Sequence, residues 1–225
     1  MKKTISTLVC LTLFGITASL GQSDKRYVTT GGEWIFSFGG TEESNIVRFS
    51  PVFNLQSYVH NDVSEHFGII YGLSLRNVGF IYDEPGKAVR KKFRTYNVGV
   101  PVGFKLGDLE RRFLYAGYEV EFPFNYKEKT FQNEKKEDKF NVWFSDRTES
   151  VAHGFFVGFQ LNSGMNIKFK YYLNNFHNMD FVETVDGQEV KPYENMENNV
   201  FYFSLNYSLF RGKKFIYTEN TGVFL

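Results

Sequence analysis

Hydrophobic and polar side chains alternate with a period of two through much of this chain of 225 residues. In the segment 67–82, Phe67 and Ile69 fall on one face, while Gly68 and Gly72 fall on the other, because successive side chains of a strand point to opposite sides. Eight segments follow this two-faced pattern, and they are 32–40, 46–59, 67–82, 95–106, 113–125, 151–161, 166–174 and 200–210. The pattern predicts an all-β fold, a single eight-stranded antiparallel up-and-down barrel.

The predicted connections differ in length between the two ends of this barrel. Those after the second, fourth and sixth strands are short, whereas 126–150 and 175–199 at the other end run to about twenty-five residues each. Short periplasmic turns and long extracellular loops are typical of bacterial outer-membrane barrels. We therefore expect a transmembrane β-barrel with both long connections outside the cell.

The content of the two faces indicates which of them points outward. The apolar face carries no Asp, Glu, Lys or Arg, as expected where Lys or Arg against lipid costs ~2–4 kcal/mol. The opposite face is rich in glycine, which weakens a solvated strand but fits the cramped inside of a small barrel. A water-surrounded periplasmic barrel is the alternative. The lipid-facing aromatic side chains are expected to be Trp34, Phe36, Phe53, Tyr71, Phe104, Phe122, Phe159, Phe169 and Phe203.

Charged side chains on the inward face predict a network of ion pairs. Eight strands leave an interior that side chains just fill, and an isolated buried charge is costly. Counting positions along the alternating strand directions places four of these charges at a similar height in the barrel. We expect these four to form the core of the network, and they are Arg76, Glu119, Glu121 and Lys170. The further lumen charges are Glu33, Arg48, Lys105 and Lys168. We favour a structural plug, with a proton- or ion-conducting pathway as the alternative.

Proline residues interrupt three of the predicted strands. Pro51, Pro101 and Pro123 have no backbone N–H to donate to a ladder. Each of these strands should therefore show a bulge or a local break.

The two ends of the chain are expected to lie outside the barrel. Residues 1–21 combine two lysines, a short apolar run and small residues before Gln22, which is typical of a cleaved secretory signal. The barrel would then occupy 22–210, followed by a periplasmic tail over 211–225, although 213–218 allows a further strand.

Charge and cysteine content narrow the range of functions. Loss of Lys2 and Lys3 with the signal changes the formal net charge from +1 to −1, which gives no electrostatic basis for binding nucleic acid. The single cysteine, Cys10, lies within the signal, so the mature chain has neither a disulfide framework nor a thiolate metal site. We expect no metal and no cofactor.

Three motifs resemble the small outer-membrane β-barrel proteins of Bacteroidota, the group that includes the PorT-like barrels. They are Gly-Gly-Glu-Trp-Ile-Phe-Ser over 31–37, Asn-Val-Gly-Phe over 77–80, and the segment 94–105 with Arg94, Tyr96, Pro101 and Lys105. Phe210 is similar to the terminal aromatic residue that the barrel-assembly machinery reads. The resemblance implies location in the outer membrane of a Gram-negative cell; it does not imply one activity.

No spacing of residues predicts catalysis. His153 has no nucleophilic serine beside it on the same face, and His60, His66 and His177 lie in or beside connections, whereas a catalytic set needs a nucleophile, a base and an orienting group within reach. We therefore expect a structural or interaction protein whose partners are outer-membrane lipid, the assembly machinery and an extracellular partner of the loops 126–150 and 175–199. A narrow conduit and a lipid-modifying enzyme are the alternatives.

Overall fold

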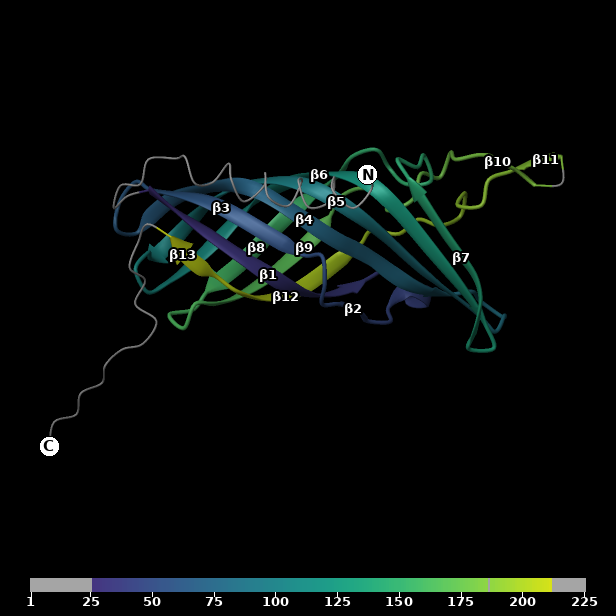
Figure 1. Ribbon diagram of the computed structural model, residues 1–225, viewed down its shortest axis with the longest axis horizontal. Helices are drawn as coiled ribbons and strands as arrows, with labels where there is room; N and C mark the ends of the chain where they lie inside the picture. Colours follow the sequence, from purple (N-terminus) through teal and green to yellow (C-terminus); the bar gives the residue numbers. More distant parts are fainter. Residues whose placement is uncertain (1–25, 186, 212–225) are drawn as a thin grey trace, which may run out of the picture.

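The strands wrap into one closed barrel in the computed structural model, which describes residues 26–185 and 187–211 (Figure 1). Eight strands of this described part form the ring, and their bounds are β1 Arg26–Phe38, β3 Leu55–Asp62, β4 Phe67–Asp83, β5 Val89–Asp108, β6 Arg112–Gln132, β8 Ala152–Gln160, β9 Met165–Tyr172 and β12 Phe201–Tyr207. They pair antiparallel in this order, and β12 closes the ring on β1. The predicted eight-stranded up-and-down barrel is confirmed.

Shorter elements lie outside the ring of eight strands. They are η1 Glu42–Ser44, β2 Arg48–Ser50, β7 Lys135–Trp143, β10 Glu183–Val185, β11 Gln188–Val190 and β13 Leu209–Arg211. Strands β2 and β13 add to β1, β7 adds to β6, and β10 pairs only with β11. Within the described ranges, no helix is long and apolar enough to cross a membrane.

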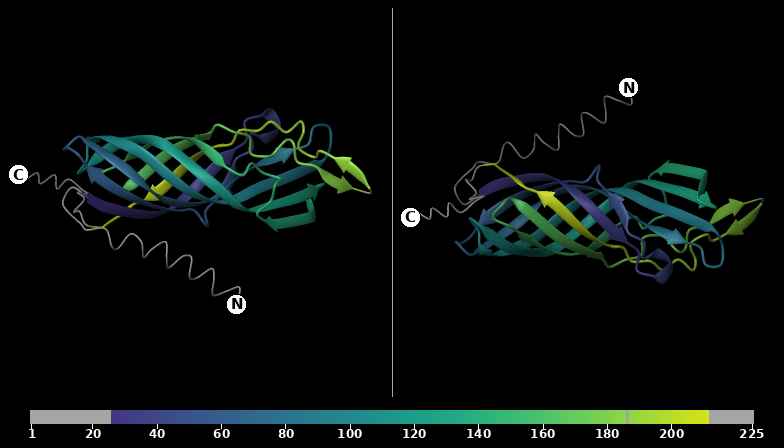
Figure 2. Two further views of the ribbon diagram at one scale, coloured as in Figure 1. Left: turned by 90° about the horizontal axis from the view of Figure 1, so that it is seen from above. Right: turned by 90° about the horizontal axis from the view of Figure 1, so that it is seen from below.

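The two ends of the barrel differ, as the lengths of the connections predict. The turns 63–66, 109–111 and 161–164 lie at one end, together with the start of β1. At the other end β4, β5 and β6 continue far past the rim, and the hairpins β6–β7 and β10–β11 project from it (Figures 1 and 2). β5 and β6 contain 20 and 21 residues, about twice the 9–11 that cross a bilayer.

The prediction of one long loop over 126–150 is wrong for residues 126–143, which form a hairpin. β6 continues to Gln132, turns through Asn133 and Glu134 with φ of 47° and 63°, and returns as β7. Two successive residues with positive φ fit a tight hairpin turn. Charged residues in this segment suggested a loop, but both faces of an extension beyond the barrel can meet water, so a strand here needs no apolar face. The loop 175–199 likewise contains the β10–β11 hairpin.

The predicted strand 46–59 is divided into β2 and β3 by an irregular segment, 51–54. This break follows from Pro51, which removes a donor, and from Phe53, whose φ is 61°. The Asn54 side-chain amide donates to the Ser50 carbonyl at 2.8 Å and closes the bend. Phe53 is exposed and points outward from a bend rather than from a strand. β1 begins at Arg26, earlier than predicted.

The other two prolines also disturb the ladders. The β5–β6 register shifts between Tyr96 and Asn97, opposite Pro123, and this bulge moves the inward positions of β6 from odd to even numbers. At Pro101 the β4–β5 pairing lapses between Val102 and Gly99 without a change of register. The possible strand 213–218, the signal 1–21 and the tail beyond residue 211 lie outside the described residues.

Inward glycines make room for the side chains that fill the barrel. A Cβ atom at Gly99 would overlap the Ser74 hydroxyl and the side chains of Glu119 and Glu121. The neighbouring Val100 points outward and is exposed. The lumen is therefore packed to the backbone at this level.

We predict that Gly99→Val lowers the free energy of unfolding by ~1–3 kcal/mol, because overpacking forces neighbouring side chains to move. The measurement is the urea midpoint of the folded, fast-migrating gel band in detergent micelles. Val100→Leu, which enlarges the adjacent outward residue, should change the midpoint little. Equal effects of the two changes would contradict a packed lumen.

Candidate functional site

The four residues predicted to meet in the lumen lie together there. Glu119 and Glu121 from β6 face the centre, where Lys170 of β9 donates to both, at 2.7 Å and 2.6 Å. Arg76 of β4 lies on the other side, with nitrogens 3.5 Å from Glu119 and 4.0 Å from Glu121. All four side chains are fully buried, so each charge depends on the others for its solvation.

Two further charges, Glu33 and Lys168, join this network. Glu33, which the sequence analysis placed outside the core of the network, bonds to two of its cations. Glu33 of β1 bonds to Arg76 and accepts from Lys168 at 2.6 Å. Among the described residues, the connected group thus contains the carboxylates Glu33, Glu119 and Glu121 and the cations Arg76, Lys168 and Lys170. Its charges cancel. Ring closure brings Glu33 to Lys168, because β12 alone lies between β1 and β9.

Neutral side chains satisfy the remaining atoms of the carboxylates. The Tyr172 hydroxyl donates to Glu121 at 2.9 Å, and the Asn97 amide donates to the same carboxylate at 2.7 Å. Ser74 donates to Glu119, and Ser204 donates to Glu33 at 3.1 Å. Buried polar groups normally find such partners, so these hydrogen bonds hold the network in one arrangement.

Arg48 and Lys105 are buried, but they lie apart from this network. The Arg48 guanidinium donates to the Asn77 side chain at 2.6 Å. Lys105 pairs with Asp62 near the turn end and donates to the Tyr27 hydroxyl at 2.6 Å. The lumen charges are therefore spread over three levels.

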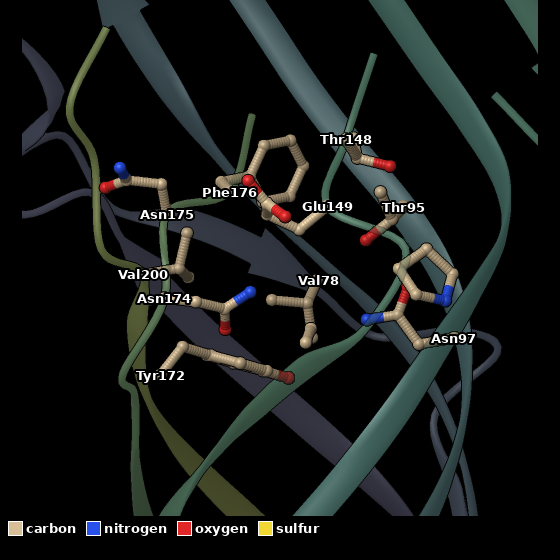
Figure 3. A pocket seen from close by; sticks show the side chains of 12 residues that line it. Val78, Thr95, Asn97, Thr148, Glu149, Tyr172, Asn174, Asn175, Phe176 and Val200 are labelled. Atoms are coloured by element: carbon tan, nitrogen blue, oxygen red, sulfur yellow. The ribbon is translucent and has the colours of Figure 1, made fainter. Parts of the chain in front are cut away.

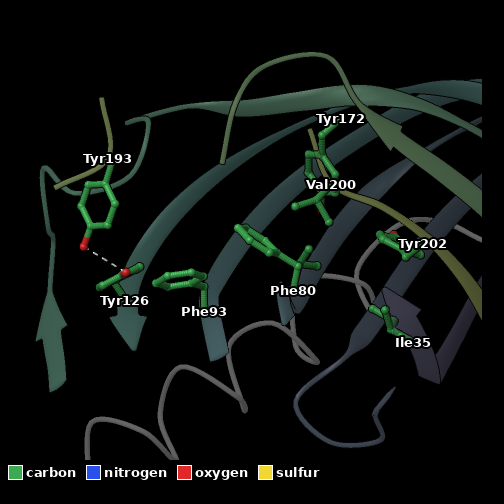
Figure 4. Packing of buried hydrophobic residues seen from close by; sticks show 9 residues of the cluster. Ile35, Phe80, Phe93, Tyr126, Tyr172, Tyr193, Val200 and Tyr202 are labelled. Carbon is green, nitrogen blue, oxygen red and sulfur yellow. Dashed lines mark hydrogen bonds between the residues drawn. The ribbon is translucent and has the colours of Figure 1, made fainter. Parts of the chain in front are cut away.

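Aromatic packing closes the barrel above the ion pairs. Figure 4 shows Tyr202, Tyr172, Phe80 and Phe93 following one another from the lumen toward the loop residue Tyr193. Beside them lies a cavity of about 20 Å³ that is roofed by the connections after β7 and β9 (Figure 3). Such a volume holds about one water molecule, so the upper lumen offers no channel at this point.

A buried cluster around His177 fixes both long connections to the rim, and sequence reasoning missed it. The His177 ring stacks on Tyr193 with 4.2 Å between centroids, and its Nε2 lies 3.3 Å from the Tyr126 hydroxyl of β6. Arg147 donates to the Tyr193 hydroxyl at 3.1 Å, and Asn178 donates its backbone N–H to the Arg147 carbonyl at 3.1 Å. An aromatic-rich loop with an isolated histidine was the only available signal.

Burial, with Lys91 and Arg147 nearby, lowers the pKa of His177 to about 3. The ring is therefore neutral at ordinary pH. It acts as an aromatic packing group that joins the two loops.

The nine predicted lipid-facing aromatic residues all lie on the outside of the barrel, and none is buried. Those that are more exposed are Trp34, Phe53, Phe104, Phe122 and Phe203, and those that are half-buried are Phe36, Tyr71, Phe159 and Phe169. Several contact one another, as Phe169 and Phe203 do at 5.0 Å between centroids. The outward surface is thus broadly aromatic and aliphatic.

The described residues hold no group of three or more His, Cys, Asp and Glu side chains able to bind a metal ion. His153 lies on the outer wall and bonds to the Tyr118 hydroxyl at 2.5 Å. Each carboxylate of the lumen network is paired with a cation.

Comparison with solved structures gives small barrels at low identity. Ail, the attachment invasion locus protein of Yersinia pestis, is 11% identical over 82% of this chain and 97% of its own, with a TM-score of 0.36. Neisserial surface protein A is 8% identical over 84% and 99%, with a TM-score of 0.41. The outer membrane protein OprG of Pseudomonas aeruginosa is 12% identical over 84% and 98%, with a TM-score of 0.36.

No protein-family model and no curated protein matches the chain. The fold assignment therefore rests on the strand order of this chain itself.

We predict that Lys170→Met lowers the free energy of unfolding by ~3–5 kcal/mol, because it leaves Glu119 and Glu121 with Arg76 alone in a buried site. Urea unfolding in micelles measures this loss. Arg90→Met, which breaks an exposed ion pair with Asp83, should cost no more than ~1 kcal/mol. If Lys170→Met lowers the free energy of unfolding as little as the control does, water solvates the network and the account of a buried site is contradicted.

We predict that the loop cluster opens as the pH falls from 7 to 5. His177 stays neutral in the folded state but takes up a proton near pH 6.5 once it is exposed. The free energy that favours the closed loop cluster is therefore fully present above pH 6.5 and falls below that pH, by ~2 kcal/mol at pH 5. Hydrogen exchange at the amides of Phe176 and Asn178 reports the opening. His177→Phe should remove the pH dependence, and the exposed-site control His66→Phe should retain it. An equal pH response in wild type and His177→Phe would contradict the assignment.

Proposed function

We propose that this chain is a bacterial outer-membrane β-barrel that serves as a rigid, filled support for an extracellular binding surface. The observation that carries this proposal is the His177 cluster, which packs both long connections against the rim of a barrel with a filled lumen. Loops held by a rigid scaffold are a common basis of recognition. Nothing in this role requires catalysis.

The outward surface supports the membrane placement. Val102, Leu114 and Phe155 are among many apolar outward side chains that are more than half exposed. A soluble protein rarely exposes contiguous apolar surface of this extent, because such surface drives aggregation. Acyl chains would cover it without cost, as in known membrane barrels.

The finer assignment, to the PorT-like barrels of Bacteroidota, is also a proposal. It is supported by the motif segment 94–105, within which Pro101 interrupts a ladder and Lys105 forms a buried ion pair. Residues 1–21 would direct export as a cleaved signal, and the assembly machinery would insert the barrel.

We predict that the purified barrel is electrically silent in planar bilayers, because paired charges and aromatic packing fill its lumen. Glu119→Ala should also give no steady conductance. A stable conductance of the wild type that Glu119→Ala abolishes would contradict the proposal and favour a conduit.

We further predict that a photo-crosslinking residue at Val185, in the exposed β10–β11 hairpin, gives a discrete protein adduct on intact cells. The same residue at the outward position Val102 should give adducts with lipid alone. Adducts at Val185 with lipid alone would contradict a binding role of this loop.

A further inference from the structure

The outward face of β5 changes character sharply at one height. Leu106, Phe104, Val102, Val100 and Val98 form an apolar run of nine positions from end to end, the length that crosses a bilayer in a tilted strand. Tyr96 follows, an amphipathic residue of the kind found at membrane interfaces. The next two outward positions are basic, which places them beside the headgroups of the outer leaflet.

These next positions are Arg94 and Lys92, and they meet two lysines of β6. In the ladder Arg94 lies opposite Lys127 and Lys92 lies opposite Lys129, while Lys129 also lies opposite Lys139 of β7. Like charges directly opposite on one face destabilise a sheet. A bound anion would offset the repulsion between these basic side chains.

The part of the chain that the structure describes does not supply this anion. Among the described residues, no carboxylate lies within ion-pair distance of Lys92, Arg94, Lys127 or Lys129. Glu128, which lies between the two lysines in sequence, bonds instead to the Tyr126 hydroxyl at 2.9 Å. Lys92 and Arg94 make ring contacts with Phe131 and Tyr96 that leave their charges uncompensated.

The four basic side chains line a hollow on the barrel wall, and the buried Arg48 lies at its inner side. The hollow has a volume of about 340 Å³, and the apolar side chains of Val47, Phe49 and Ile81 form part of its wall. The four cationic residues are half-buried. Burial, followed by the nearby Arg94, lowers the pKa of both Lys127 and Lys129, as expected where positive charges are crowded without a counter-ion.

We infer that this hollow, formed by Lys92, Arg94, Lys127 and Lys129, binds the phosphate groups of an outer-leaflet lipid of the lipid A type. Phosphates carry the charge that four cations need, and the apolar wall suits the adjoining acyl chains. The inference rests on the membrane placement proposed above, because only that placement brings the hollow to headgroup height.

The test compares Lys127→Gln/Lys129→Gln with the wild-type full chain, both refolded into phosphatidylcholine vesicles. The control is Arg111→Gln/Arg112→Gln, an equal charge change at the turn end. Diphosphoryl lipid A is titrated, with dephosphorylated lipid A and inorganic phosphate as separate probes. At about 1 kcal/mol per basic side chain, the hollow variant should bind diphosphoryl lipid A about 30-fold more weakly, and the control should bind as the wild type does.

Folding is checked by the fast-migrating gel band in vesicles without lipid A. There the hollow variant should be as stable as the wild type or more stable, because a like-charge contact is relieved. Equal affinity for diphosphoryl and dephosphorylated lipid A, or equal affinity of both variants, would overturn the inference. So would competition by inorganic phosphate at the concentration of the lipid, which would indicate a site for a free anion. Failure of the wild type to enter vesicles would instead overturn the membrane placement.

Discussion

The wall of this barrel is one strand thick, so each strand has to satisfy two different surroundings with alternate side chains. Outward positions carry Phe, Val, Leu and Ile, whereas inward positions carry glycines and charges that reach their partners only because the ring is closed. The pairing of Glu33 with Lys168 illustrates this dependence. These residues lie far apart in sequence and come together through β12, which joins the first and last parts of the ring.

Closure also explains why the lumen network is neutral. The six charges are removed from water, and a buried ion costs several kcal/mol unless it is paired and hydrogen-bonded. Arg76 contacts three carboxylates, so it links the ion pairs made by Lys168 and Lys170 into one network. The aromatic layer above, from Tyr202 to Phe93, then separates this polar layer from the loops. A rigid plug and a rigid rim follow from the same packing.

Much of this arrangement can be read from the sequence, because strand alternation is local and strong. The eight strands, the inward Glu119 and Lys170 and the outward Phe122 all follow from counting positions. Elements that depend on tertiary context cannot be read in this way. The β6–β7 hairpin extends into water, where alternation carries no apolar signal, and the bulge opposite Pro123 reverses the inward parity so that Tyr126 turns inward. His177 is surrounded by partners from three separate segments, and no sequence spacing encodes that meeting.

The placement of the outward face against acyl chains is tested most directly by nitroxide labels on single cysteines at Val102 and Leu205, in a chain with Cys10→Ser. Both positions are outward and exposed. Collision rates with molecular oxygen, which concentrates in the bilayer, are compared with those of a water-soluble nickel chelate. The account predicts frequent collisions with oxygen and few with nickel at both sites in vesicles. Frequent nickel collisions at both sites in folded protein would mean that water surrounds the barrel, and would contradict the account.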